Sequence, residues 1–357
     1  MLGLKPIRFN GINYLGERGQ DWMSTDFNLS KLITQNILYS AYHESKTIAE
    51  ISELLGTPKG SIKEEVILLE DNGFIDKVSE DKYITNILIH DLPIDVYEEV
   101  HSIYKVLAKN IVDNYILKLT TTPIPEYLYV PENDVNFFLW SLITLNLCHK
   151  LEDPQIKDNL QKHYIKRNDG SDNIVFTTIE KEYKHKQTEV ILFADYPKEL
   201  YPFYVWQFNS EYDDRIRDWS RAIQEGFEDL HDYLKNKPTS EDTFKTLINR
   251  SLLIKDDTQY YANILISKGS INDFLKITPP IPNEIIEISE KISNNLIKIT
   301  NHHYPPHMQK LAFDYYQNIL SNGELIPHVL DILVKDGILK KVKEHQKKTV
   351  NMIMVME

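Results

Sequence analysis

The spacing of apolar residues predicts a helix early in the chain, and the polar residues after it predict a second one. Between residues 29 and 42, apolar positions recur every three to four residues, the period of one helical face. Thr47 with Glu50 three residues later has the pattern of a capping box, in which each residue bonds the backbone of the other. The sequence therefore predicts a helix over Ile48–Leu55. Gly56 should end it, because glycine adopts the left-handed conformation at little steric cost.

The next segment predicts a third helix and then a β-hairpin. Pro58 suits the first turn of a helix, and apolar residues follow at helical spacing up to Leu69. We expect this helix to end at Gly73. The runs 74–78 and 83–89 are rich in β-branched and aromatic residues, and the polar residues between them predict a turn. The order helix, helix, tight turn, helix, hairpin is the layout of a winged helix-turn-helix.

Two motifs in this segment resemble those of bacterial winged helix-turn-helix transcriptional regulators. They are Thr47-Ile-Ala-Glu-Ile-Ser-Glu-Leu-Leu-Gly56, before the turn, and Leu69-Glu-Asp-Asn-Gly-Phe-Ile75, at the end of the recognition helix. Ser52 stands where such regulators usually have alanine, which exchanges one small residue for another. The resemblance covers residues 28–91 of the 357. It implies a winged-helix domain that binds DNA.

In a helix-turn-helix, the exposed N-terminal half of the recognition helix enters the major groove. Here that half lies within residues 57–63. Lysine reaches phosphate or the edge of guanine, serine bonds either, and a helix N-terminus favours phosphate. With two residues at the wing, the predicted DNA contacts are Thr57, Lys59, Ser61, Lys63, Lys82 and Tyr83.

The charge of this segment keeps a second function open. Residues 24–91 hold six lysines and no arginine against twelve acidic residues. Few phosphate contacts give weak binding that depends little on salt. The alternative to DNA binding is therefore an adaptor, in which an acidic winged helix docks a protein partner such as transcription machinery.

The rest of the chain predicts a mixed α+β region, so the expected fold class is α+β with an N-terminal winged helix-turn-helix. Residues 94–119 have apolar residues at coiled-coil spacing, which fits either a homodimer seam or a helix packed on its own chain. Helices and strand-like runs then alternate. The expected domains are 1–92, a winged helix with a lead-in, then 93–240, a central α+β domain, and 241–357, a domain of helix-hairpin units.

A short motif recurs in the C-terminal third. Tyr83-Ile-Thr-Asn-Ile-Leu-Ile89 is matched by Tyr260-Tyr-Ala-Asn-Ile-Leu-Ile266 with five identities in seven positions, and Thr349-Val-Asn-Met-Ile-Met-Val355 echoes it. Each copy follows a helix end and a short strand. One interpretation is three wing-like modules, with a second winged helix at 306–357. The other is convergence, because amphipathic hairpins after helices look alike.

Composition excludes several classes of function. The chain has 40 Lys and Arg against 53 Asp and Glu, a net charge of −13, which opposes non-specific binding of nucleic acid by the chain as a whole. The single cysteine, Cys148, excludes an internal disulfide or a multi-cysteine zinc site. The longest mostly apolar run, 137–148, is too short to span a membrane, and the first twenty residues lack a signal-peptide pattern. Because catalytic and nucleotide-binding motifs are also missing from the sequence, we expect no enzyme, cofactor or metal.

Three other groups of residues have candidate chemistry. Five lysines could form a positive hairpin tip that touches phosphate, or a solvated turn: Lys340, Lys341, Lys343, Lys347 and Lys348. Aromatic residues that alternate along a strand could line an effector pocket or pack in a core: Tyr204, Trp206 and Phe208, with Trp219 nearby. Histidines form the third group. The prolines near His302, His303 and His307 disfavour a metal site, and His90 and His101 could titrate near neutral pH, although an ordinary structural role is favoured for both.

The resemblance to bacterial winged-helix regulators implies a cytoplasmic transcription regulator, and the sequence gives no sign of enzymatic activity. Its winged helix would bind double-stranded DNA, and its larger C-terminal part would sense a ligand or a protein partner and set the oligomeric state. A ligand that prefers one arrangement of paired recognition helices would then shift binding.

Overall fold

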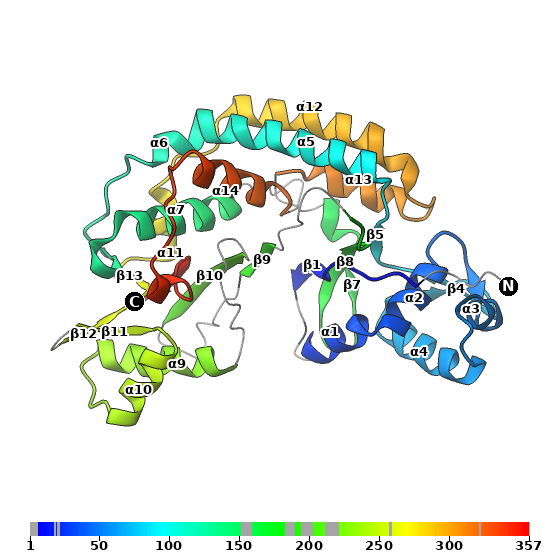
Figure 1. The fold of residues 1–357 in the computed structure, drawn as a ribbon, viewed down its shortest axis with the longest axis horizontal. Helices are drawn as coiled ribbons and strands as arrows, with labels where there is room; N and C mark the ends of the chain where they lie inside the picture. Colours follow the sequence, from blue (N-terminus) through cyan, green and yellow to red (C-terminus); the bar gives the residue numbers. More distant parts are fainter. Residues whose placement is uncertain are drawn as a thin grey trace. The chain divides into compact units, whose positions relative to one another are not determined.

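The fold is α+β, as the sequence predicts (Figure 1). The chain divides into two compact units. The computed structural model describes residues 6–17, 19, 22–150, 159–182, 190–193, 203–210, 221–256, 259–320 and 323–356. Unit 1 comprises residues 1–103, 153–186 and 290–322, and unit 2 comprises 104–152, 187–289 and 323–357.

The boundaries of these units differ from the three contiguous domains expected from the sequence. Two helices, α5 (Ile94–Ile111) and α12 (Asn283–Thr300), each begin in one unit and end in the other. Each unit therefore contains residues from both halves of the chain. Local patterning could not reveal this exchange, because it depends on contacts between residues far apart in sequence.

The described residues of unit 1 form two small sheets and the helices around them. In chain order, the elements complete within it are β1 (Asn13–Glu17), α1 (Trp22–Ser30), α2 (Leu32–Ser40), β2 (Lys46–Thr47), α3 (Ile48–Leu55), α4 (Lys59–Asp71), β3 (Ile75–Lys77), β4 (Lys82–Thr85), β5 (Leu88–His90), β7 (Ile165–Lys166), β8 (Asp172–Thr178), the 3-10 turn Asn301–His303 and α13 (Gln309–Gln317). One sheet has the order β2-β4-β3 and is antiparallel. In the other, β8 pairs with β5 in parallel and with β1 and β7 in antiparallel.

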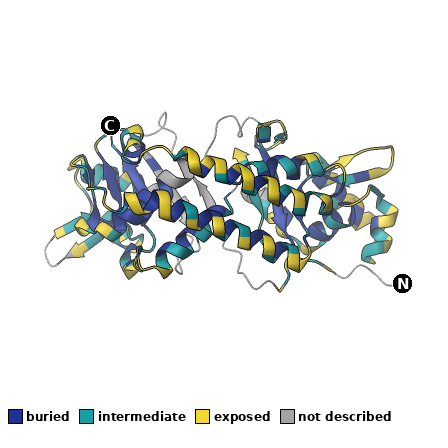
Figure 2. Cartoon of the chain, turned by 90° about the horizontal axis from the view of Figure 1, so that it is seen from above, coloured by how far each residue is buried: buried dark blue, intermediate teal, exposed yellow. Residues whose placement is uncertain are grey.

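The first sheet of unit 1 is held against helices α2, α3 and α4, which lie together with β4 in Figure 1. Buried and exposed residues lie on different sides of several helices of the chain (Figure 2), and Ile37 of α2, Ile51 of α3 and Leu69 of α4 have at most 1% of their surface exposed. Thr85 fastens the sheet to α2, since its Oγ1 donates to the carbonyl of Leu38 at 2.5 Å. The packing of these elements fixes the position of α4.

Unit 2 contains a larger sheet and a separate hairpin. The elements complete within it are the π-helical turn Val112–Ile116, α6 (Leu117–Leu119), β6 (Leu128–Tyr129), the 3-10 turn Pro131–Asn133, α7 (Val135–Lys150), β9 (Val190–Phe193), β10 (Tyr204–Ser210), α9 (Arg221–Leu234), α10 (Glu241–Asn249), β11 (Leu253–Asp256), β12 (Gln259–Ala262), β13 (Leu265–Ser267), α11 (Ile271–Lys276), α14 (Leu325–Lys335), the 3-10 turn Glu344–Gln346 and β14 (Met352–Val355). The sheet order is β6-β13-β14-β10-β9, and β11 pairs with β12. Residues of α9, α10 and both sheets share one apolar core.

Two predictions about strands differ from the structure. The run 83–89 is not one strand: β4 ends at Thr85 and pairs with β3, whereas β5 pairs with β8. Residues 306–357 do not form a second winged helix, because α13 and α14 belong to different units. The last strand, β14, pairs with β10 and β13 instead of closing a hairpin.

The apolar face of α5 is covered by the chain itself. Val100, Leu107 and Ile111, three of the residues at coiled-coil spacing, are 5%, 0% and 0% exposed. This burial fits the interpretation of a helix packed on its own chain. Over the described residues, the structure contains no helix that combines the length and the apolar character needed to cross a membrane.

Candidate functional site

A capping box begins α3, as predicted, and fixes the first helix of the candidate site. The backbone N–H of Glu50 donates to Thr47 Oγ1 at 3.1 Å, and the backbone N–H of Thr47 donates to Glu50 Oε2 at 2.7 Å. This backbone bond, with the Thr47 hydroxyl, holds the pKa of the Glu50 carboxyl below its usual value. The helix spans Ile48–Leu55, the predicted range.

The turn between α3 and α4 is closed by glycine and by a serine whose role the sequence did not reveal. Gly56 has φ 62°, and the N–H of Thr57 donates to the carbonyl of Ser52 at 3.2 Å. Ser52 Oγ donates in return to the carbonyl of Thr57 at 2.6 Å. An alanine in this position could not make that bond. The departure of Ser52 from the regulator motif was the one available signal for it.

The first turn of α4 is open to solvent. Pro58 precedes the helix in an extended conformation, no side chain caps it, and the N–H of Ile62 is the first to bond back, to the carbonyl of Pro58 at 3.2 Å. A Cβ built on Gly60 meets no atom within 4 Å. The N–H groups of a helix's first turn have no partner within the helix, so this turn offers donors and the positive end of the helix dipole.

The side chains of α4 separate into a buried face and an exposed one. Ile62, Val66 and Leu69 are at most 1% exposed, whereas Lys59, Ser61 and Lys63 are exposed. Neither Lys59 nor Lys63 forms an ion pair with any residue that the structure describes. The structure thus brings three of the predicted contacts together on one accessible turn.

Several acidic side chains near α4 are occupied elsewhere. Glu65 is turned toward α2, where it lies 3.7 Å from Lys31 Nζ and accepts a bond from Thr34 Oγ1 at 3.3 Å. Glu44 pairs with Lys46. Glu65 is therefore paired on the α2 side of α4, whereas Glu64, next to Lys63, is exposed.

The hairpin β3–β4 contributes less than predicted. Lys82 is exposed, but Tyr83 is only 6% exposed, because β4 alternates and turns Tyr83 and Thr85 inward. The Nζ of Lys77 lies 6.0 Å from the centre of the Tyr83 ring. The prediction of Tyr83 as a surface contact is therefore wrong. Thr57 is half-buried, and its hydroxyl bonds the carbonyl of Leu55 at 3.4 Å.

Comparisons with protein-family models, curated proteins and solved structures find no match for this chain. The resemblance to winged-helix regulators therefore depends on the motifs and on the local geometry.

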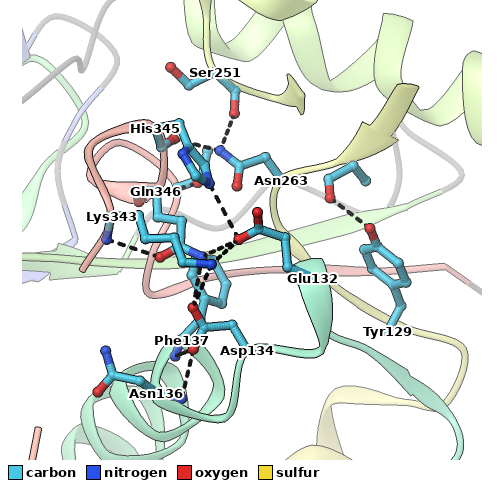
Figure 3. A network of polar contacts seen from close by, with 12 residues as sticks. Tyr129, Glu132, Asp134, Asn136, Phe137, Ser251, Asn263, Lys343, His345 and Gln346 are labelled. Atoms are coloured by element: carbon cyan, nitrogen blue, oxygen red, sulfur yellow. Dashed lines mark hydrogen bonds and ion pairs between the residues drawn. The ribbon is translucent and has the colours of Figure 1, made fainter. Parts of the chain in front are cut away.

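The predicted second basic site is not a hairpin tip. Residues 339–351 form a loop with the 3-10 turn Glu344–Gln346. Lys343 Nζ lies 2.6 Å from Glu132 Oε2 and 3.5 Å from Asp134 Oδ2, as Figure 3 shows. Lys347 lies 2.7 Å from Glu344.

The backbone of this loop is also fixed. The carbonyl of Lys340 accepts bonds from Trp140 Nε1–H at 2.9 Å and from Asn136 Nδ2 at 3.0 Å. Lys341 and Lys348 lie on the same loop. The side chain of Lys341 is exposed, and that of Lys348 is half-buried. The loop is thus bonded to residues about 200 positions earlier in the chain. Ion pairs with Glu132, Asp134 and Glu344 neutralise part of its positive charge.

The remaining candidates do not form a described site. Tyr204, Trp206 and Phe208 lie on β10, but their side chains and all of Trp219 lie outside the described residues, so the predicted effector pocket stays a prediction. Among the described residues no three His, Cys, Asp or Glu side chains are grouped to hold a metal ion.

Two histidines have structural contacts. His307 Nε2 lies 3.1 Å from the carbonyl of Thr85. Burial lowers the pKa of His90 to about 3. Of the two interpretations of His90, titration near neutral pH does not fit the folded protein, and a structural role does.

Proposed function

We propose that residues 28–91 form a winged helix that binds double-stranded DNA through the first turn of α4, as part of a transcription regulator. The observation that carries the proposal is the pair Lys59 and Lys63, exposed and one turn apart at an uncapped helix N-terminus. Phosphate is attracted by both lysines and by the free N–H groups of the same turn. Ser61 lies between the lysines and can bond a base edge or a phosphate.

The order of elements supports the same proposal. Helices α3 and α4 are joined by a three-residue turn, and β2, β3 and β4 form a small antiparallel sheet beside them. In winged helices, this arrangement presents the second helix of the pair to the major groove. The tip of the β3–β4 hairpin carries the exposed acids Glu80 and Asp81, which would oppose phosphate. Binding should therefore involve few phosphates and depend modestly on salt.

Fluorescence anisotropy with a labelled random-sequence duplex across a salt series tests the proposal. Lys59→Ala with Lys63→Ala should weaken binding and flatten the salt slope by up to about 2, since each lysine on a phosphate contributes about 1. The matched control is Lys291→Ala with Lys298→Ala, two exposed lysines of α12 in the same unit. Equal binding by the two double variants would show that α4 is not the contact.

A protein-docking function is the second candidate, and one observation favours it. Ile67 follows Lys63 by one turn and is 42% exposed, and Val78 on the hairpin is 54% exposed. These exposed apolar residues, with the exposed acids Glu80 and Asp81 on the same hairpin as Val78, suit a partner with a basic and apolar surface. Absence of duplex binding by the wild type at low salt, together with loss of a captured protein partner in the variant Ile67→Ser, would favour this candidate.

A further inference from the structure

The helix-hairpin region of unit 1 has a counterpart in unit 2 with the same strand register. In β3–β4, Ile75 pairs with Thr85 and Lys77 with Tyr83. In β11–β12, the residues 177 or 178 positions further along pair in the same way, Leu253 with Ala262 and Lys255 with Tyr260. The lysine also lies over the tyrosine ring in both, at 6.0 Å and 5.5 Å.

The bonds that flank the two hairpins agree as well. Two residues after the last residue of α4 lies Gly73, with φ 68°, and two residues after the last residue of α10 lies Ser251, with φ 61°. The next N–H bonds back five residues in both, from Phe74 to Leu69 and from Leu252 to Leu247, each at 2.9 Å. After each hairpin, an asparagine N–H donates at 2.9 Å to the residue that follows the helix end: Asn86 to Phe74, and Asn263 to Leu252.

The correspondence continues into the larger sheets. In unit 1, β5 pairs in parallel with β8, where Leu88 lies opposite Phe176. In unit 2, β13 pairs in parallel with β14, where Leu265 lies opposite Ile353. Leu265 is 177 positions after Leu88, and Ile353 is 177 positions after Phe176. Each second strand then pairs in antiparallel with an earlier strand of its own unit, β8 with β1 and β14 with β10.

The helix before each hairpin helix also corresponds. Helix α3 ends at Gly56, with φ 62°, and Pro58 follows two residues later. Helix α9 is followed by Asn236, with φ 57°, and Pro238. In both turns the next N–H bonds back five residues, from Thr57 to Ser52 at 3.2 Å and from Lys237 to Asp232 at 3.0 Å. Convergence of isolated hairpins does not explain agreement over so many elements in the same order.

The two modules differ in the chemistry of their helix N-termini. With Pro58 aligned on Pro238, Lys59 is replaced by Thr239, Ser61 by Glu241 and Lys63 by Thr243, and α10 carries a second acid at Asp242. Both acids are exposed, and Lys245 lies 3.1 Å and 3.6 Å from them. Lys237, the counterpart of Thr57, lies before the helix, and its Nζ lies 2.7 Å from Asp232 Oδ1.

The first turn of α10 is also capped, unlike that of α4. Ser240 Oγ accepts the backbone N–H of Thr243 at 3.1 Å. A phosphate at the first turn of α10 would therefore meet the carboxylates of Glu241 and Asp242 and two lysines that are already paired. One backbone N–H of that turn is also already bonded, to Ser240 Oγ. The residues that make α4 suitable for DNA have been replaced or neutralised in its counterpart.

We infer that the chain is a tandem duplication that carries two helix-hairpin modules in one polypeptide, and that only the α4 module contacts DNA. One chain then binds one half-site as a monomer, so its duplex target is asymmetric instead of palindromic. This inference rests on the proposed function, because it assigns the stoichiometry and the target class of the same surface. A homodimer through 94–119 is not needed, since the second module lies in the same chain.

The test uses the full chain and a labelled random-sequence duplex of about 24 base pairs, long enough for two half-sites one helical turn apart. Mass photometry should find the free protein at 41.9 kDa and one chain on each duplex. In anisotropy, Lys237→Ala with Lys245→Ala should bind like the control Lys291→Ala with Lys298→Ala, which loses the same charge, while Lys59→Ala with Lys63→Ala binds more weakly.

The outcomes separate the two proposals. Two chains on one duplex, or a loss by Lys237→Ala with Lys245→Ala as large as that of the α4 variant, overturns this inference and leaves DNA binding intact. A wild-type chain that does not raise the anisotropy at about 50 mM salt overturns the proposed function and this inference with it. Circular dichroism of each variant confirms that the comparison is between folded proteins.

Discussion

Replacing His90 tests whether unit 1 holds a neutral imidazole in an apolar site. His90 is 6% exposed, and its Nδ1 lies 2.6 Å from Tyr304 Oη. Rings of Phe176, Tyr315 and Tyr316 surround it, and its Nε2 is buried without a hydrogen-bond partner. Burial disfavours the charged form, so the pKa falls from 6.5 to about 3.

The size of the effect follows from linkage. Because the folded pKa lies below the unfolded value of 6.5, stability is complete above that pH and is lost as the pH falls toward 3. At pH 5 the unfolded histidine is mostly protonated and the folded one is not. The distance of 1.5 pH units below 6.5, at about 1.36 kcal/mol per unit, gives a loss of about 2 kcal/mol. This figure hardly changes if the folded pKa is one unit higher.

Urea denaturation followed by circular dichroism at pH 8, 6.5 and 5 measures this loss. His90→Phe keeps an aromatic ring and removes the titrating group, so its free energy of unfolding should fall by about 2 kcal/mol less between pH 8 and 5. His302→Gln, which removes an exposed histidine of the same unit, is the control. If His90→Phe and the wild type lose the same stability over this range, the reasoning from burial is refuted.

Two further predictions concern the anchors of each unit. Thr47→Ala removes the capping box with Glu50 and should lower the free energy of unfolding by about 1 kcal/mol in urea denaturation, whereas an equal stability would show that the cap contributes nothing. Asp134→Asn acts in unit 2: burial raises the pKa of Asp134, but bonds from the Gln346 amide and the backbone outweigh it and hold the pKa below 3.8. The free energy of unfolding of the wild type should therefore fall as the pH drops below 3.8. In the same acid titration, the free energy of unfolding of Asp134→Asn should fall by less.

The helices of the candidate site could be read from the sequence because their signals are local. Thr47, Glu50 and Gly56 set the ends of α3, and the spacing of Ile62 and Leu69 set the buried face of α4. The exposure of the opposite face of α4 followed from the same period. Caps and periodicity act within a few residues, so distant parts of the chain were not needed to predict them.

The features that escaped prediction depend on distant partners. Nothing near Thr85 indicates that β4 stops there, since the next strand leaves to pair with β8, almost ninety residues later. The lysine-rich run after residue 339 was predicted as a hairpin tip because nothing nearby in the sequence shows its partners. Lys343 pairs with Glu132 and Asp134, about 210 residues earlier. The repeated motif was visible, but its extent appeared only once strand registers could be compared.

The interleaving of the two units has a consequence for synthesis. Unit 1 includes residues 290–322, where Tyr304 meets His90 and Asp314 lies 2.8 Å from His163. When residue 186 leaves the ribosome, about a hundred more residues must follow before this last segment arrives, a delay of about 5–20 s at ordinary rates of translation. During that interval the apolar surface that awaits it is uncovered, so nascent chains should depend on chaperones that shield such surfaces.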